Sequence, residues 1–253
     1  MSYYLIFIFL FLNLALALCA AILARKFFGF LKNLSRNVDD LKTLVWDGPL
    51  LQKAVQPSAL LPQPGGWAAS IDLLMEIVRL IEERRPEKVV ELGSGLSTVV
   101  IALKLKNLGF GKLISIDHDG KYASVTKSYL AAHGVSDIVE MRIAPLSRRL
   151  APDSEVPWYD TAQLTGIDDI DMLIVDGPPR TISPLARKPT FSFFRPFMRG
   201  DWIMVLDDAN REGERAIIQE WALAAPELKI VMLPLSKGAA LISLARRSSD
   251  DLG

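Results

Sequence analysis

The segment VVELGSGLST, from Val89 to Thr98, constrains the fold more than any other part of the chain. It begins with branched apolar residues typical of a buried strand, and apolar residues recur at helical spacing after Gly95. Glycines between a strand and a helix permit unusual backbone dihedrals and let a ligand approach the backbone N–H groups at the helix N-terminus. The segment therefore predicts a strand, a ligand-binding turn at Gly93, Ser94 and Gly95, and a helix.

Strand and helix signals alternate along the chain after Trp67. Such alternation is typical of a mostly parallel sheet whose two faces are covered by helices. We therefore predict an α/β domain over residues 67–253, built on a doubly wound, mostly parallel, seven-stranded sheet. The expected strands are 88–92, 112–116, 138–143, 171–175, 202–206, 228–233 and 239–245, and the expected helices are 71–81, 96–103, 121–133 and 212–224.

The N-terminal run from Tyr3 to Ala24 carries no charged residue. As a helix it would measure about 33 Å, enough to cross a bilayer core of about 30 Å. A cleaved signal peptide is the alternative, but it would have basic residues before the apolar run and a small-x-small cleavage site after it. We expect a retained, single-pass transmembrane anchor over residues 1–26. Because Arg25 and Lys26 follow the run and no basic residue precedes it, the positive-inside rule predicts an outside N-terminus and a cytoplasmic domain.

Residues 27–66 form a juxtamembrane segment between the anchor and the domain. Apolar residues at steps of three and four predict an amphipathic helix at its start, namely Phe27, Leu31, Leu34, Val38, Leu41 and Val45. This helix could lie on the membrane surface, pack on the globular domain, or pair in a homodimer through residues 27–46. Four prolines between Gly48 and Gly66 argue against a continuous helix there, so we interpret this stretch as a linker.

The composition excludes several classes of function. Lys plus Arg and Asp plus Glu both total 29, so no net charge attracts nucleic acid and no such partner is expected. With one cysteine and two histidines, the chain cannot build a disulfide framework or a zinc centre rich in these residues.

The residues around the glycine turn favour a nucleoside ligand that carries positive charge. A dinucleotide site would have a third glycine where Thr98 stands. Glu91 precedes the turn, and a carboxylate there suits a cationic ligand better than phosphates. Asp117 follows by about twenty residues, at the end of the next strand, where an acid accepts hydrogen bonds from both ribose hydroxyls. S-adenosylmethionine, with its ammonium and sulfonium groups, meets these requirements.

Three segments resemble the cofactor motifs of class I S-adenosylmethionine-dependent methyltransferases: ELGSGLS, ISIDHD and RIAPL. The resemblance runs from about Trp67 to Ala245. It implies that Glu91, Gly93 and Gly95 border the methionine portion of the cofactor, Asp117 binds the ribose, and Ala144 lies near the adenine. The full set of expected cofactor-binding residues is Glu91, Gly93, Ser94, Gly95, Ser97, Asp117, His118, Ala144 and Asp176.

A second polar cluster follows two later strands: Asp176 after 171–175, and Asp207, Asp208 and Asn210 after 202–206. Ends of neighbouring parallel strands lie close together, and carboxylate and amide oxygens suit Mg²⁺ or a similar ion. Metal-dependent O-methyltransferases of the catechol type are similar here. The resemblance implies that Asp176 and Asp208 are catalytic and hold an ion with Asn210, Asp207 being an alternative ligand. The competing explanation is that these residues cap the next helix and fix loops.

The cluster departs from that family at two places. Ala209 separates the acid from the amide, which are adjacent in the family. The family's lysine base is replaced by Pro179, and Arg180 follows it; because arginine stays protonated, we expect Arg180 to hold an anionic acceptor. Trp158 and Tyr159 lie in a long excursion before 171–175, where they either form an acceptor wall or pack against the domain.

The sequence thus predicts a membrane-anchored, S-adenosylmethionine-dependent O-methyltransferase assisted by a divalent cation. Its acceptor would be a small molecule or a lipid-linked compound. Two alternatives stay open: an aminopropyl transferase on the same fold, and a non-catalytic, membrane-tethered scaffold with a nucleoside-binding domain.

Overall fold

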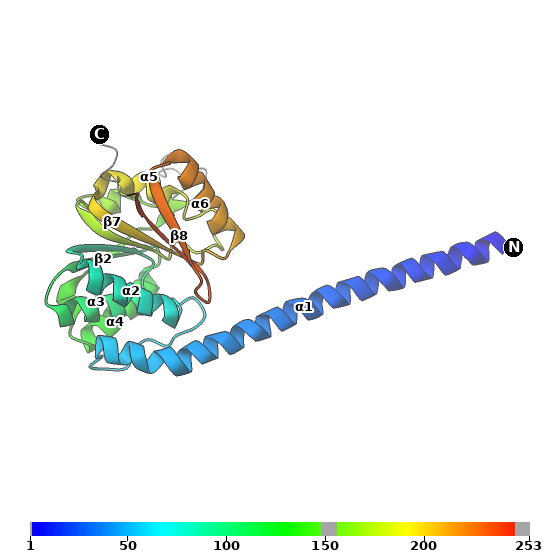
Figure 1. Cartoon of the computed structure of the whole chain (residues 1–253), viewed down its shortest axis with the longest axis horizontal. Helices are drawn as coiled ribbons and strands as arrows, with labels where there is room; N and C mark the ends of the chain where they lie inside the picture. The colour runs from blue at the N-terminus through cyan, green and yellow to red at the C-terminus, as the bar shows by residue number, and fades with distance from the viewer. Residues whose placement is uncertain (1, 148–155, 246–253) are drawn as a thin grey trace, which may run out of the picture. The chain divides into compact units, whose positions relative to one another are not determined.

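The computed structural model describes residues 2–147 and 156–245. It divides into two compact units, Met1–Val45 and Trp46–Gly253. The second unit has the predicted architecture, a mostly parallel seven-stranded sheet covered by helices (Figure 1).

The first unit consists of the greater part of helix α1, Ser2–Val55. Within α1, Tyr3–Leu31 has a mean hydropathy of 2.8 and none of it is buried. Among the described residues, this is the one helix long and apolar enough to cross a membrane. Its length and composition agree with the predicted anchor. The apolar residues of the predicted amphipathic stretch, such as Leu34 and Leu41, are helical and exposed.

The end of α1 corrects the predicted linker. The helix continues through Pro49 to Val55, and only from Gln56 to Ser70 does the chain lack helix. Pro49 lacks just the N–H that would bond the Val45 carbonyl, and burial of Leu51 and Val55 in the core stabilises the last turns. The compact domain therefore begins at Trp46 rather than at the predicted boundary of residue 67.

Hydrogen bonds from α3, Leu96–Leu108, hold the end of α1 in the domain. The Lys104 ammonium donates to the Ala54 carbonyl at 3.3 Å, and the Asn107 side-chain amide donates to the Val55 carbonyl at 2.7 Å. Both carbonyls belong to the last turn of a helix, where backbone acceptors lack intrahelical partners. This contact was not predicted, because the proline-rich stretch obscures the buried apolar positions.

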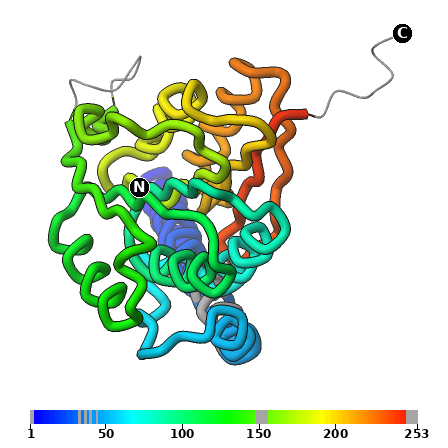
Figure 2. Tube along the Cα trace, turned by 90° about the vertical axis from the view of Figure 1, so that its left-hand side faces the viewer, coloured from blue at the N-terminus to red at the C-terminus, as the bar shows by residue number. Residues whose placement is uncertain are grey.

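The sheet has the strand order β3-β2-β1-β6-β7-β9-β8. All neighbours are parallel except β9, which is antiparallel to both β7 and β8. Its edges, β3 in green and β8 in orange, lie on opposite sides of the second unit (Figure 2). The strands are β1 Lys88–Leu92, β2 Lys112–Asp117, β3 Val139–Ile143, β6 Ile170–Val175, β7 Met198–Asp207, β8 Leu228–Leu233 and β9 Ala239–Leu244.

Helices cover both faces of this sheet (Figure 1). One layer contains α2 Ile71–Arg84, α3 Leu96–Leu108 and α4 Gly120–Ala132; the other contains α5 Pro189–Phe194 and α6 Glu212–Ala224. Successive strand residues point to opposite faces, so in β1 Val89 packs in the core beneath α2 and α3, whereas Val90 and Leu92 pack beneath α5 and α6. Three short 3-10 helices complete the domain: η1 Ser136–Ile138, η2 Thr161–Leu164 and η3 Arg195–Phe197.

The long excursion between β3 and β6 contains a small antiparallel pair, β4 Leu146–Ser147 with β5 Trp158–Tyr159. Trp158 is fully buried, and its ring centroid lies 5.0 Å from that of Phe193. The aromatic residues therefore pack against the domain, one of the two predicted roles. Helix α5 was not predicted, because six residues are too short to show a periodic pattern.

The strand order reverses between β1 and β6: successive strands lead outward to β3 on one side and toward β8 on the other. In open α/β sheets, ligands bind at such a switch point, outside the carboxyl ends of the strands. The predicted site residues follow β1, β2, β6 and β7, so the topology gathers them at this crevice.

Candidate active site

A cavity of about 270 Å³ lies at the carboxyl ends of the central strands. It brings together six of the predicted residues: Gly93, Ser94, Asp117, His118, Asp176 and Asp208. The other lining residues are Gly66, Trp67, Tyr122, Gly177, Pro179, Thr181, Arg187, Arg211 and Lys237.

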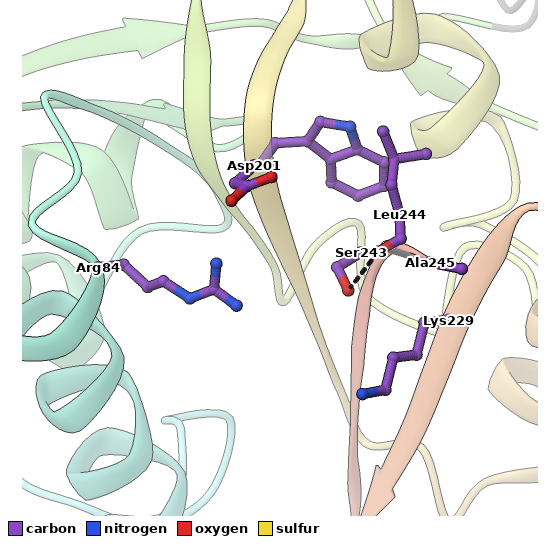
Figure 3. A pocket seen from close by; sticks show the side chains of 7 residues that line it. Arg84, Asp201, Lys229, Ser243, Leu244 and Ala245 are labelled. Atoms are coloured by element: carbon purple, nitrogen blue, oxygen red, sulfur yellow. Dashed lines mark hydrogen bonds between the residues drawn. The ribbon is translucent and has the colours of Figure 1, made fainter. Parts of the chain in front are cut away.

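A second cavity, of about 410 Å³, lies at the amino-terminal part of β7 (Figure 3). Arg84, Asp201 and Lys229 line it, together with the end of β9. This is the opposite end of the parallel strands from the crevice at β1 and β6. Because ligands of such sheets bind at the carboxyl ends, we assign the candidate active site to the 270 Å³ cavity.

The glycine turn after β1 is tied to the end of β2. The Gly93 N–H donates to the Ile116 carbonyl at 2.8 Å, and the Ser94 N–H and hydroxyl donate to Asp117 Oδ2 at 2.9 and 2.5 Å. Gly93 has a φ of +96°, and a Cβ there would lie 3.2 Å from the Gly177 nitrogen. Apart from its chain neighbours, no described residue has a heavy atom within 4 Å of the position a Cβ would take on Gly95. The turn thus combines a fixed backbone with open space for a ligand.

Asp117 is ionised at the edge of this turn. Burial alone would raise its pKa, but hydrogen bonds from His118 and Ser94 and from the backbone N–H of Asp119 lower the pKa below its ordinary value. His118 Nδ1 lies 3.4 Å from Asp117 Oδ1, and both residues line the cavity. An ionised carboxylate only accepts hydrogen bonds, which suits the hydroxyls of a ribose.

Glu91 lies beneath the turn rather than in the cavity. It is fully buried on the face of β1 covered by α3, where its Oε2 accepts hydrogen bonds from Thr98 at 2.6 Å and Ser115 at 2.8 Å. The Thr98 hydroxyl also accepts the Gly95 N–H at 2.9 Å. Thr98, in the place of a third glycine, therefore connects Glu91 to the turn. Glu91 therefore supports the turn from below and does not line the cavity, and its predicted place at the methionine portion of the cofactor stays a prediction.

Two features of the Glu91 carboxylate indicate a functional position. Its Oε1 is buried and has no hydrogen-bond partner among the described residues. Burial raises its pKa to about 7, against the opposing effect of the hydroxyls of Ser97, Thr98 and Ser115. A buried carboxyl with an unmatched oxygen is free to respond to a positive charge placed in the turn above it.

Ser97 and Ala144 are buried and do not line the cavity. The Ala144 N–H donates to the Asp117 carbonyl at 2.8 Å, which places Ala144 beside the end of β2 as the adenine prediction requires. Their contacts with a cofactor stay predictions.

The acids after β6 and β7 meet as predicted. Carboxylate oxygens of Asp176, Asp207 and Asp208 all lie within 4.8 Å of one another. Asn210 does not join the cavity: it is exposed, and its Cγ would lie 2.5 Å from a Cβ placed on Gly238. Asp208 adopts a left-handed φ of +62°, and the turn that follows carries Asn210 against Gly238. Asn210 therefore does not line the cavity, and its role as a metal ligand stays a prediction.

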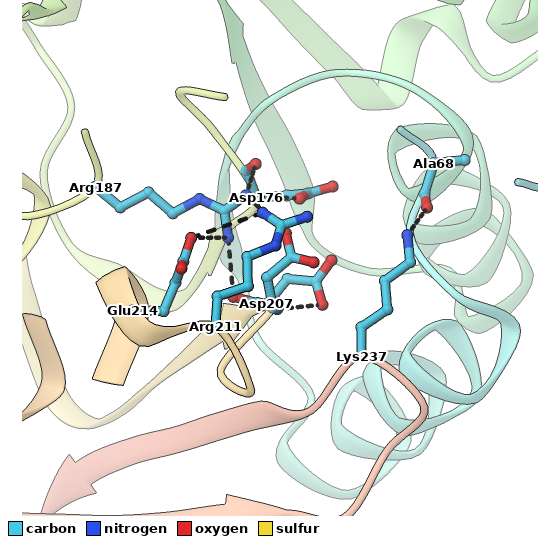
Figure 4. Close-up of polar contacts among 8 residues, drawn as sticks. Ala68, Asp176, Arg187, Asp207, Arg211, Glu214 and Lys237 are labelled. Carbon is cyan, nitrogen blue, oxygen red and sulfur yellow. Dashed lines mark hydrogen bonds and ion pairs between the residues drawn. The ribbon is translucent and has the colours of Figure 1, made fainter. Parts of the chain in front are cut away.

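An arginine that was not predicted lies inside this acidic cluster (Figure 4). Arg187 is 3% exposed, and its Nη2 lies 3.2 Å from Asp176 Oδ1 and 3.1 Å from Asp208 Oδ2. Its Nη1 donates to the Asp207 carbonyl at 2.8 Å. Arg211 adds a second cation, with Nη1 2.6 Å from Asp208 Oδ2.

Burial disfavours the charged form of the carboxylates in this cluster, and the neighbouring arginines stabilise that form. Burial raises the pKa of Asp176, while Arg187 opposes the rise. Burial likewise raises the pKa of Asp207 well above its ordinary value, and the charges of Asp176 and Asp208 add to the effect. Lys237 lines the same cavity and donates to the Ala68 carbonyl at 2.8 Å.

The two predicted ligands differ in how they fit these residues. S-adenosylmethionine fits, because the turn offers open space, an ionised acid at the ribose position and an unmatched carboxylate oxygen beneath it. A divalent ion fits these residues less well, because guanidinium groups already contact Asp176 Oδ1 and Asp208 Oδ2.

Sequence reasoning missed Arg187, Arg211 and Lys237. It favoured Arg180 instead, which is exposed and does not line the cavity. A buried arginine has no local signature that separates it from a surface one. The available signal was electrostatic: several buried acids at neighbouring strand ends require a cationic partner.

Comparisons with known proteins agree with this site. Residues 90–209 match a family described as a methyltransferase domain. No curated protein sequence matches the chain. Among solved structures, the SAH-bound methyltransferase PaMTH1 from Podospora anserina is 12% identical, with a TM-score of 0.56, covering 71% of this chain and 80% of that protein.

Two O-methyltransferases are also similar in structure. The enzyme from Bacillus cereus in complex with SAH is 18% identical, with a TM-score of 0.55, covering 81% of this chain and 91% of that protein. TomG from Streptomyces achromogenes, in complex with SAM and involved in tomaymycin synthesis, is 17% identical, with a TM-score of 0.53, covering 74% and 93%. At these identities the likeness establishes the fold.

The family match spans the glycine turn, Asp117 and both acidic strand ends, and the fold has the strand order described above. Residues 90–209 therefore match a methyltransferase domain, and the chain has the fold of S-adenosylmethionine-dependent methyltransferases.

Proposed function

We propose that this methyltransferase is held at a membrane and transfers the methyl group of S-adenosylmethionine to a hydroxyl oxygen. One observation carries the proposal: a single cavity joins the nucleoside-type turn at Ser94 and Asp117 to the half-buried Asp176 and the buried Asp208. The cofactor and the acceptor would therefore meet between β1 and β6.

The cofactor half of the cavity is formed by the turn and the end of β2. Asp117, ionised by its hydrogen bonds, would accept the ribose hydroxyls, and His118 would flank them. The backbone at Gly95 leaves space for the methionine portion, with Glu91 beneath it. When bound, S-adenosylmethionine supplies a sulfonium methyl group.

The acceptor half is formed by the ends of β6 and β7. Asp176 lines the cavity, and its raised pKa makes its carboxylate a stronger proton acceptor than an exposed aspartate. The acceptor oxygen would bond to the methyl carbon as the carbon–sulfur bond breaks, and the hydroxyl proton would pass to Asp176. Asp208, paired with Arg187 and Arg211, would fix the geometry beside it.

The cations at the cavity suggest an acceptor with a negative group. Arg211 and Lys237 are basic residues that line the acceptor side of the cavity. Together with the proposed membrane anchor, these two cations favour a small anionic molecule or a lipid-linked compound over a neutral soluble acceptor. The oxygen specificity is supported by the O-methyltransferases among the similar structures.

The membrane part of the proposal depends on α1. The span Tyr3–Leu31 would cross the bilayer once, and Arg25 and Lys26 at its end favour a cytoplasmic domain. The exposed apolar residues that follow, such as Leu34 and Val38, would pair two copies through residues 27–46 or lie at the membrane surface. The predicted assistance by a divalent ion would require Arg187 to leave the acids it contacts.

Isothermal titration with S-adenosylmethionine tests the cofactor site. We expect one molecule bound per wild-type chain, and affinity reduced at least about tenfold in Asp117→Ala, because the ribose hydroxyls lose a charged acceptor. Asp168→Ala is the matched control, since Asp168 is an exposed acid whose partner is Lys88. Absence of binding to folded wild-type protein, or equal affinity in Asp117→Ala, would contradict the proposal. A product formed from decarboxylated S-adenosylmethionine would instead indicate an aminopropyl transferase.

A further inference from the structure

We propose that Arg187 is the resident cation of the acidic cluster and takes the place that a divalent ion would have at the ends of β6 and β7. Arg187 is thus a positioning residue: it fixes Asp176 and Asp208, which face the cavity. This inference rests on the proposed O-methyl transfer only for the role of those two acids.

The guanidinium of Arg187 bridges two acids. One nitrogen, Nη2, contacts both Asp176 Oδ1 and Asp208 Oδ2, so a single donor bridges two acids from different strands. The planar fork of arginine suits such bridging, because it presents several N–H donors in fixed directions. A metal ion bridging these two oxygens would need the same position.

The guanidinium of Arg187 also contacts the backbone of two strands. Arg187 donates through Nη2 to the Asp176 carbonyl and through Nη1 to the Asp207 carbonyl at 2.8 Å. Arg187 therefore holds the backbone at the ends of β6 and β7 as well as the side chains of Asp176 and Asp208 (Figure 4). The guanidinium lies too deep in the structure to be a mobile surface group, being 3% exposed.

Acids around Arg187 already have cationic partners without a metal ion. Two further acids lie near Arg187: Glu214 Oε1 is 3.7 Å from Nη1, and Asp207 is almost fully buried. The carboxylates of Asp176, Asp208 and Glu214 are paired with the guanidinium groups of Arg187 and Arg211. A divalent ion would add two positive charges beside an arginine that cannot deprotonate. Binding an ion would therefore require expulsion of a buried, multiply bonded side chain.

Manganese titration of the full-length protein in detergent tests the assignment directly. We expect wild type to bind no Mn²⁺ below about millimolar concentration, and its affinity for S-adenosylmethionine to be unchanged by exhaustive chelation. Stoichiometric Mn²⁺ binding by wild type that is lost in Asp208→Asn would overturn the proposal. These measurements need no arginine variant, and cofactor titration in parallel separates failure of this inference from failure of the proposed function.

Two variants sharpen the test. Arg187→Met keeps the length of the side chain and removes its charge, so the uncompensated acids should gain Mn²⁺ binding and the unfolding temperature should rise when Mn²⁺ is added. Arg215→Met, an exposed position on α6, is the matched control and should show neither change. A folded Arg187→Met protein that is as stable as wild type and still does not bind Mn²⁺ would show that Arg187 does not hold the acids.

Discussion

Thr98 shows how one side chain sets the character of the site. Its hydroxyl accepts the Gly95 N–H and donates to Glu91, so it joins the turn to a carboxylate buried one layer below. A glycine at this position would leave room for a pyrophosphate but would break that connection. In the sequence, the absence of a third glycine favoured S-adenosylmethionine over a dinucleotide as the ligand. The reason, a hydrogen bond to Glu91, required the structure.

Glu91 gives a prediction at the residue scale. Its folded pKa of about 7 lies above the ordinary value of 4.5, so its contribution to stability is fully present below about pH 4.5 and is lost as the pH rises through 7. Gln in its place keeps acceptors for Thr98 and Ser115 and does not ionise. We expect the free energy of unfolding of Glu91→Gln, relative to wild type, to improve by about 2 to 3 kcal/mol between pH 5 and pH 8.

Urea denaturation of both proteins at the two pH values measures this difference. Other buried acids titrate in both proteins and cancel in the comparison. A difference that stays constant across this range would mean that Glu91 is ionised throughout and that its burial costs less than we infer.

At the scale of elements, the strands and long helices were predicted within a few residues, because buried strands and helices of this fold carry strong patterns. Strand β1 agrees at both ends, Lys88 and Leu92. The failures occurred where tertiary contacts override local preference. Pro49 lies inside a helix because Leu51 and Val55 are buried, and α5 is fixed by aromatic packing that no short pattern encodes.

The last turns of α1 provide the element-scale prediction. Leu51 is 1% exposed, so Leu51→Ala should destabilise the domain by about 2 to 5 kcal/mol through lost packing and a residual cavity. Its neighbour Leu50 is 53% exposed, and Leu50→Ala should change stability by less than about 0.5 kcal/mol. Thermal unfolding compares the two; similar effects of both substitutions would argue that residues 46–55 are not part of the core.

At the scale of the whole molecule, the structure divides into one unit that contains most of the apolar helix and one unit that contains the sheet. Sequence periodicity located both, and motif spacing located the glycine turn and the acids. It could not locate the cation that neutralises those acids, because Arg187 reaches them from a loop ahead of α5. Long-range electrostatic pairing of this kind is decided by the assembled fold.

Truncation tests the boundary between the units. A chain beginning at Trp46 retains the end of α1 and should fold and bind S-adenosylmethionine with the affinity of the full-length protein. A chain beginning at Trp67 loses Leu51 and Val55 from the core and should be markedly less stable. Circular dichroism melts and cofactor titration distinguish them. Equal stability of both would restore residue 67 as the start of the domain.

The central claim, methyl transfer to a membrane-proximal hydroxyl, is tested by incubating the full-length protein with methyl-labelled S-adenosylmethionine and fractionated native membranes. We predict that label accumulates in one anionic membrane compound as a methyl ether. Labelling should fall at least about tenfold with Asp117→Ala or Asp176→Asn and persist with Asp168→Ala. Label that never exceeds the Asp117→Ala background, in a protein that binds the cofactor, would contradict the account.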